Sequence, residues 1–270
     1  AKMLYWRNAN LNFDTEEKLF SSLEKKPTDK NLIRIQSTIR EYFNWDLNDD
    51  KKSALNLLNY IENISIKNWN RSERDKTLKN IINIFSKLNG KNIVIIGAAV
   101  TLSEMIEMLN QDNFFVAADG AVGIFSDLPS EMSKLAWSKL VCIVSDADGG
   151  PATEKGFMKG VPIILHSHGD NEISWKKFLQ LGINSDDETK IVLTHQIPNE
   201  IPGMYNIGGF TDGDRAVCFV RSAGIEKDKI IMIGTRTDIV GEWSGCTDKN
   251  QKLEKLKWMA KVLNLLEIKY

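Results

Sequence analysis

Six short apolar runs, spread over the last two thirds of the chain, constrain its fold more than any other feature. They are rich in Val and Ile, and they read NIVIIG, FFVAAD, LVCIVSD, VPIILHSH, KIVLTHQ and KIIMIGT. Helix-like stretches or turn residues separate most of them. This alternation is typical of a mostly parallel sheet with helices on both faces. We therefore predict an α/β domain over residues 91–270.

Residues 1–90 follow a different, helical pattern. Asp14, with a Glu three residues later, has the spacing of a capping box. Ser72 is placed to cap a later helix, in which apolar residues recur at helical spacing until Gly90 ends it. No group of chemically active side chains is visible here. We predict a smaller N-terminal helical region followed by a Rossmann-like catalytic domain.

Composition excludes several classes of protein. The formal net charge of -1 provides no general attraction to nucleic acid or to an anionic membrane. The three cysteines are too few and too widely spaced for a disulfide framework or a zinc knuckle. No signal peptide or apolar run of spanning length is visible. We expect a cytoplasmic protein, and exposed apolar residues on the N-terminal helices would offer a face for a homodimer.

Polar and titratable residues follow nearly every apolar run. In chain order they are Asp119, Asp146, Asp148, His166, His168, Asp170, Asn171, His195 and, after a Gly pair, Thr211, Asp212, Asp214 and Arg215. Ligands of parallel α/β sheets bind at the carboxyl ends of the strands. We therefore expect these side chains to gather around one site.

Carboxylates at strand ends favour a magnesium site. Mg²⁺ prefers oxygen ligands and is usually held by one or two carboxylates together with substrate phosphates. Asp146 and Asp148, with Asp119 and Asp170 at neighbouring strand ends, would supply those ligands. The alternative for the Asp-x-Asp-Gly-Gly segment is a plain turn, because Asp and Gly both suit tight backbone geometry.

The histidines suggest a zinc hydrolase as another alternative. His166 and His168 would face the same way on an extended chain, and His195 follows the next run. No His-Glu-x-x-His motif is present, however. A histidine that is simply hydrogen-bonded at a strand end accounts for each of the three better than zinc ligation does.

Phosphate binding has weaker signals. The P-loop pattern is absent, but the turn GAAVTLSE, from Gly97 through Thr101, would present a helix N-terminus to an anion. Arg215 and Lys252 would neutralise phosphate charge, or would equally well cover a helix face.

Five segments, in this order, resemble one enzyme family. They are ADGA at 118–121, SDADGG at 145–150, HSHGDN at 166–171, GGFTDGDRA at 208–216 and KNQKLEKL at 249–256. They are similar to segments of the archaeal 6-hydroxymethyl-7,8-dihydropterin diphosphokinases, which are related in fold to thiamin pyrophosphokinases. The resemblance covers roughly residues 90–270.

The resemblance implies Mg²⁺-dependent transfer of diphosphate from ATP to the hydroxymethyl arm of a reduced pterin, with release of AMP. It also implies roles for individual residues. The metal ligands would be Asp146, Asp148 and Asp119, and the catalytic residues would be His168, Asp170 and Asn171. The nucleotide phosphates would contact Gly97, Thr101, Asp119, Gly120 and Arg215. The pterin would contact Gly209, Phe210, Thr211, Asp212 and Asp214.

Two segments depart from the family pattern. The first turn of the family usually reads G-x-G-P-S-L, whereas this chain has Gly-Ala-Ala-Val-Thr-Leu from Gly97. The metal segment usually reads TDLDG, whereas this chain has SDADG, which keeps both carboxylates. Two alternatives therefore stay open: a thiamin pyrophosphokinase, and a relative that binds a nucleotide without turnover.

Overall fold

The structure is a computed structural model, and it describes residues 29–88, 90–183, 185, 189–245 and 248–270. The helix start predicted at Asp14 lies outside these residues. Within them, none of the helices combines the length and the apolar character that a membrane span requires.

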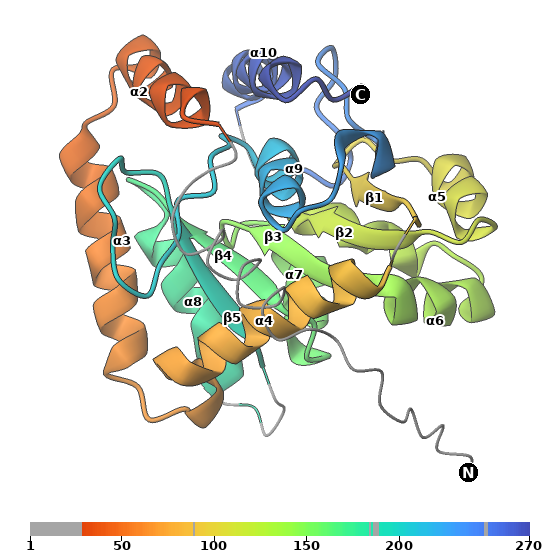
Figure 1. The fold of residues 1–270 in the computed structure, drawn as a ribbon, viewed down its shortest axis with the longest axis horizontal. Coiled ribbons are helices and arrows are strands. Elements are labelled where there is room, and N and C mark those ends of the chain that lie inside the picture. Colours follow the sequence, from red (N-terminus) through yellow and green to blue (C-terminus); the bar gives the residue numbers. More distant parts are fainter. Residues whose placement is uncertain (1–28, 89, 184, 186–188, 246–247) are drawn as a thin grey trace.

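A single sheet of six parallel strands forms the centre of the molecule (Figure 1). The strands are β1 (Ile93–Ile96), β2 (Phe114–Ala118), β3 (Leu140–Ser145), β4 (Ile163–Ser167), β5 (Ile191–His195) and β6 (Ile230–Ile233). Their spatial order is β5-β4-β3-β2-β1-β6, so the strand order reverses at β1. Each strand falls in one of the six apolar runs, which confirms the predicted α/β fold.

The apolar runs are continuous because both faces of the sheet are covered. Successive strand residues point to opposite faces, and β1 shows the consequence. Its residues Ile93 and Ile95 belong to one hydrophobic cluster, whereas Val94 and Ile96 belong to the other. All four side chains are fully buried.

Helices form the two outer layers. The cluster around Ile93 contains residues of α2 (Asn31–Phe43), α4 (Arg71–Lys87), α9 (Asp212–Ser222) and α10 (Lys249–Leu265). The opposite cluster contains residues of α3 (Leu47–Glu62), α5 (Leu102–Leu109), α6 (Ser130–Lys139), α7 (Gly150–Met158) and α8 (Glu172–Ile183). Short 3₁₀ helices are η1 (Lys67–Trp69), η2 (Asp119–Ser126) and η3 (Lys227–Lys229).

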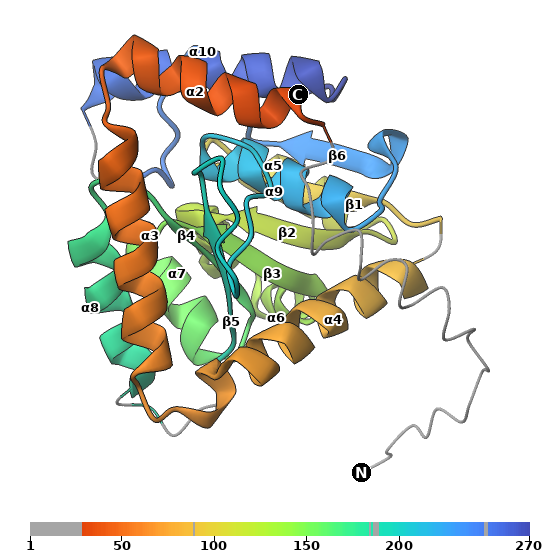
Figure 2. The same ribbon diagram turned by 60° about the vertical axis from the view of Figure 1, so that its left-hand side comes forward.

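The N-terminal helices pack directly on the sheet. Figures 1 and 2 both show α2 beside α10 and α3 beside α8, and α4 contacts β5. Residues of these helices occur in both hydrophobic clusters, for example Ile81 of α4 in one and Leu57 of α3 in the other. The N-terminal helices therefore share the core of the α/β domain.

The predicted cap of α4 was misplaced by two residues. Asn70, rather than Ser72, is the N-cap, because its side chain accepts a hydrogen bond of 3.0 Å from the backbone N–H of Glu73. Ser72 donates to the Asn70 side chain over 2.8 Å. The helix ends at Lys87, and Gly90 follows with a φ of 81°.

Candidate active site

The carboxyl edge of the sheet carries the candidate site. Asp119 follows β2 directly, Asp146 follows β3, and His168 follows β4. Asp212 begins α9, which packs against β2 and β3. Because parallel strands end at the same edge, residues up to 93 positions apart in the sequence, from Asp119 to Asp212, come together there.

Three carboxylates form the centre of the site. One oxygen from each of Asp119, Asp146 and Asp148 lies within 4.8 Å of the other two. The Asp119 carboxylate is buried and accepts hydrogen bonds from the hydroxyls of Ser145 and Thr153. Oδ1 of Asp146 is also buried and, among the described residues, has no hydrogen-bond partner.

This cluster fits a divalent cation. Burial, reinforced by the negative charges of Asp212, Asp146 and Asp148, raises the pKa of Asp119 well above its usual range. Three carboxylates held this close repel one another unless a proton or a cation neutralises them. An orphaned buried oxygen beside two further oxygen ligands is what Mg²⁺ or a similar hard cation would bind.

His168 bridges two of the acidic residues. Its Nε2 lies 3.2 Å from Oδ2 of Asp146, and its Nδ1 lies 2.8 Å from Oδ1 of Asp170. Burial alone would lower the pKa of His168, but the hydrogen bonds to Asp146 and Asp170 outweigh it and raise the pKa to about 9. A protonated imidazole orients Asp146 and supplies positive charge, and in that state it does not accept a proton.

Asp146 stays ionised although it is half-buried. Burial opposes its ionisation, whereas hydrogen bonding and charge from His168, together with the charge of Arg215, lower its pKa. Asp212 shows the opposite balance. Burial and the charge of Asp146 raise the pKa of Asp212 to about 7, and the nearby Arg215 only partly offsets them.

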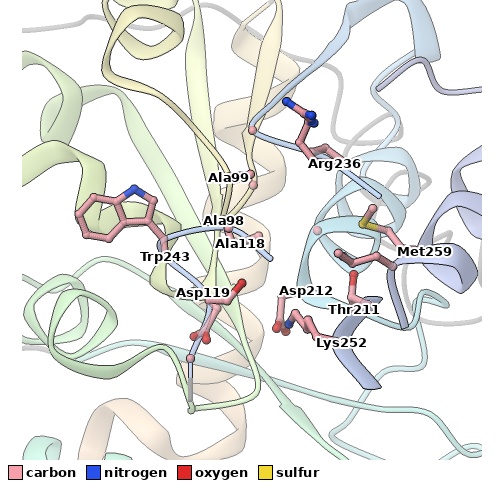
Figure 3. A pocket seen from close by; sticks show the side chains of 18 of the residues that line it. Ala98, Ala99, Ala118, Asp119, Thr211, Asp212, Arg236, Trp243, Lys252 and Met259 are labelled. Carbon is pink, nitrogen blue, oxygen red and sulfur yellow. The ribbon is translucent and has the colours of Figure 1, made fainter. Parts of the chain in front are cut away.

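Two hollows meet at the carboxylate cluster. Both are lined by Asp148, Thr211, Asp212, Gly245 and Lys252. Figure 3 shows the first hollow, with Asp119, Asp212 and Lys252 near its centre. Groups placed in the two hollows would therefore meet beside the cluster.

The first hollow lies over the turn after β1. Gly97, Ala98 and Ala99 form one wall, and the segment 234–245 after β6 forms another. The two walls are tightly joined, since the backbone N–H of Trp243 donates to the carbonyl of Ala98 over 3.0 Å. A Cβ on Gly97 would come within 2.6 Å of the Gly234 carbonyl oxygen, so this close approach requires glycine.

The second hollow has a volume of about 310 Å³ and lies between the α2–α3 link and the start of α9. Arg215 lines it from α9, Phe210 from the loop before α9, and His168 from the loop after β4. Nη1 of Arg215 lies 3.5 Å from Asp212, and Nη2 donates to Oε1 of Gln196 over 3.1 Å. Arg215, predicted to contact phosphate, thus lies on the side of the second hollow.

The structure brings most of the predicted site residues to the two hollows. Gly97 and Asp119 line the first; Asp146, His168, Asp170, Phe210 and Arg215 line the second; and Asp148, Thr211 and Asp212 line both.

Four other predicted residues have structural partners instead. Thr101 caps α5 in a capping box with Glu104. Asp214 is fully buried and accepts hydrogen bonds from the backbone N–H groups of Phe210 and Thr211. Together with Thr211 it forms the capping box of α9. Gly120 packs against the Trp243 carbonyl, and Gly209 packs against Arg215 at a φ of 85°.

Asn171 orders the loop after β4. Its amide donates to the carbonyls of Asp146 and His166, and its Oδ1 accepts from the backbone N–H of His168. The side chain is 5% exposed. Asn171 therefore positions His168 and Asp146 and does not line either hollow.

The three histidines do not form a metal site. His166 lies within β4, where its Nδ1 is 3.0 Å from the Thr194 hydroxyl, and burial lowers its pKa well below the usual value. Nδ1 of His195 accepts from the backbone N–H of Ile197. Among the described residues, the group close enough to share an ion is the Asp119, Asp146 and Asp148 cluster.

Several residues of the second hollow were not predicted, because they belong to α3 or to the link between α2 and α3. They are Asn44, Trp45, Asp46, Asp49 and Asp50. The sequence WDLNDD at 45–50, with an aromatic residue and three acidic residues together, was the available signal.

Fold and site together define an α/β enzyme whose site lies at the carboxyl edge of a parallel sheet. Curated relatives place it more narrowly. The chain is 31% identical over 253 residues to the 6-hydroxymethyl-7,8-dihydropterin pyrophosphokinase of Methanocaldococcus jannaschii, which covers 86% of this chain and 92% of the relative. Proteins of the same name from Pyrococcus furiosus and Methanothermobacter thermautotrophicus are 27% identical over 191 residues and 30% identical over 134 residues.

The chain therefore belongs to the 6-hydroxymethyl-7,8-dihydropterin pyrophosphokinase family, and it is a diphosphokinase. This confirms the family resemblance seen in the sequence. The P. furiosus match covers 66% of this chain and the M. thermautotrophicus match 46%. No family model matches the chain, and no solved structure matches it either.

Proposed function

We propose that the protein transfers diphosphate from ATP to 6-hydroxymethyl-7,8-dihydropterin, in a Mg²⁺-dependent reaction that releases AMP. The observation that carries this proposal is the position of the carboxylate cluster at the junction of two hollows. A reaction between two substrates around a cation needs such an arrangement. The names of the relatives support the same acceptor.

The bonds exchanged are few. The hydroxymethyl oxygen bonds to the β-phosphorus of ATP, the bond from that phosphorus to the oxygen bridging the α-phosphorus breaks, and AMP leaves. The hydroxyl proton is released. Catalysis of phosphoryl transfer consists mainly of positioning and charge neutralisation, which are the functions that a rigid, charged site provides.

Asp119, Asp146 and Asp148 would hold Mg²⁺, which when bound neutralises negative charge on the transferred group. The protein's own cations would add to this. Lys252 lines both hollows, so it would lie next to the transferred diphosphate. His168 keeps Asp146 ionised and in place.

A thiamin pyrophosphokinase is the second candidate, since it would use the same donor and a different acceptor. A relative that binds a nucleotide without turnover is the third. Its support is the departure of the turn at Gly97 from the family pattern. That turn nevertheless lines the first hollow, although the backbone N–H groups of Gly97 and Ala99 already donate to the carbonyls of Ile233 and Gly234.

The deciding experiment measures AMP and ADP formed from ATP and Mg²⁺, with the pterin and thiamin offered in separate reactions. We expect AMP to form only in the reaction with the pterin, and no AMP to form there after addition of EDTA. AMP formed only in the reaction with thiamin would show that thiamin, and not the pterin, is the acceptor. Nucleotide binding without AMP release in either reaction would favour the non-catalytic relative.

A further inference from the structure

The second hollow has an aromatic wall that the N-terminal helices supply. Trp45, in the link between α2 and α3, stacks on Phe43 with ring centroids 4.6 Å apart and an interplanar angle of 15°. Phe210 lies 6.0 Å from both rings. Trp45 is 37% exposed, with Nζ of Lys255 5.4 Å from its ring centroid, and Phe210 is 7% exposed. Trp45 is therefore the most accessible of these rings, and a molecule that stacks on it would lie beside Lys255.

The position of Trp45 is fixed before any ligand binds. Asn44 ends α2 in the left-handed conformation, with a φ of 55°, and the backbone N–H of Trp45 donates to the Arg40 carbonyl over 2.9 Å. Phe43 supports the indole from one side. A preorganised ring binds a planar ligand with little loss of conformational entropy.

The floor of the hollow is a hydrogen-bond network centred on Asp50. The Asp50 carboxylate accepts from Arg40 over 3.2 Å, from the Gln196 amide over 2.9 Å and from the Gly169 N–H over 2.9 Å. Gln196 in turn accepts from Arg215. Because Asp50 and Gln196 already have these partners, recognition of a ligand falls mainly to the walls and to Arg215, whose buried Nε has no hydrogen-bond partner among the described residues.

The charges of the two hollows differ. Seven carboxylates line the second hollow, and the cationic side chains there are Arg215, Lys252, Lys255 and the protonated His168. The carboxylates are Asp46, Asp49, Asp50, Asp146, Asp148, Asp170 and Asp212. The excess of carboxylates disfavours a polyanionic triphosphate there, whereas a neutral heterocycle with amino and ring N–H donors would find acceptors in the exposed Asp46, Asp49 and Asp170. The first hollow has fewer carboxylates, Asp119, Asp148 and Asp212, beside the cations Lys252 and Arg236, so phosphates would be repelled less there.

We propose that the second hollow binds the planar ring system of the acceptor and that Trp45 stacks against it, which makes Trp45 a determinant of acceptor affinity. The inference rests on the proposed function, and it adds that the two substrates occupy different hollows. The acceptor ring lies between the α2–α3 link and α9, and the nucleotide phosphates lie over the turn after β1. Planar aromatic systems prefer such offset stacking, and the hollow has the volume of a small-molecule site.

The test is steady-state AMP release by Trp45→Ala and Trp45→Phe, with each substrate varied while the other is saturating. We expect Trp45→Ala to raise the KM for the pterin by roughly tenfold or more and to change the KM for ATP by less than about twofold. Trp45→Phe keeps a stacking ring and should restore most of the affinity. Tyr42→Ala is the control for loss of a neighbouring ring, because Tyr42 is 57% exposed, contacts Phe43 and Trp258 edge-on and does not line the hollow.

An unchanged KM for the pterin in Trp45→Ala, or a raised KM for ATP in its place, would overturn the inference. If the wild-type protein releases no AMP with the pterin, the proposed reaction fails separately. Calorimetric titration of the full chain with 6-hydroxymethylpterin then tests whether the second hollow binds a pterin ring. Binding that Trp45→Ala weakens and Tyr42→Ala retains supports the inference; equal binding by all variants, or none by the wild type, contradicts it.

Discussion

Nε2 of His168 lies 3.2 Å from Oδ2 of Asp146, whereas Oδ1 of the same carboxylate is buried and has no hydrogen-bond partner among the described residues. One oxygen is thus used to orient the group, and the other remains available beside Asp119 and Asp148. Together the three side chains form a preorganised set of oxygen ligands.

Asp146→Asn should reduce AMP release by about a hundredfold or more, since it removes a charge that the transition state depends on while conserving shape. The amide oxygen can still accept from His168, so circular dichroism and the unfolding midpoint should remain close to those of the wild type. Asp228→Asn, in the exposed 3₁₀ helix before β6, is the control and should retain full activity. Near-wild-type turnover by Asp146→Asn would show that the metal assignment is wrong.

Mg²⁺ should stabilise the wild-type protein against unfolding. A ligand present at a hundred times its Kd stabilises the native state by about 2.7 kcal/mol. Asp148→Asn removes one of three repelling carboxylates, so without Mg²⁺ it should be at least as stable as the wild type, and its response to Mg²⁺ should be smaller. Thermal unfolding at several MgCl₂ concentrations measures both effects. An equal Mg²⁺ response in the two proteins would place the ion elsewhere.

Gly123→Ala should disturb the segment that covers the first hollow. A Cβ at Gly123 would lie 2.2 Å from the indole of Trp243, so the indole must move. Overpacking of this kind destabilises by typically 1–3 kcal/mol, and displacement of segment 234–245 should also raise the KM for ATP. Denaturant unfolding and ATP-dependent kinetics measure the two effects.

Two further variants test this explanation. Trp243→Ala removes the obstructing indole, so adding Gly123→Ala to it should cost much less than in the wild type. Gly213→Ala is the control for stability, because its Cβ would meet atoms no closer than 3.8 Å. Strictly additive effects of Gly123→Ala and Trp243→Ala would argue against the clash.

Acid should destabilise the protein partly through His195. Burial lowers the pKa of His195 to about 4, and its Nδ1 already accepts the Ile197 N–H. Below the unfolded-state pKa of about 6.5 the unfolded chain binds a proton that the native state does not, so stability falls as the pH falls toward 4. At pH 5 this amounts to about 2 kcal/mol.

His195→Asn keeps an acceptor for the Ile197 N–H and removes the titration. Its free energy of unfolding should therefore decrease less than that of the wild type between pH 7.5 and pH 5. Urea unfolding at the two pH values gives the comparison. Parallel pH dependences would mean that His195 does not contribute.

Local patterns in the chain predicted much of the fold. The run from Ile93 to Ile96 is apolar at every position because both faces of the sheet are covered, and apolar continuity is visible without a structure. Placement of Asp119, Asp146 and Asp148 after such runs predicted their convergence, since parallel strands end at a common edge.

Helix caps were readable in principle and were partly missed. Thr101 with Glu104, and Thr211 with Asp214, both have the spacing of a capping box. Thr101 and Asp214 were predicted to contact ligands, whereas in the structure their side chains accept hydrogen bonds from nearby backbone N–H groups. Helix capping and ligand binding use the same residue types, such as Thr and Asp, so local sequence does not distinguish a capping residue from a binding residue.

By itself, the sequence determined the parallel α/β architecture, the carboxylates at its edge and the family of the chain, because these depend on periodicity and on motifs of a few residues. Only the tertiary structure decided that Trp45 and Asp50 belong to the same site. Asp50 meets Gly169 and Gln196 across 119 and 146 positions of the chain. Such contacts arise from the packing of α2 and α3 against the sheet and α10, and no local pattern records which distant residues that packing brings together.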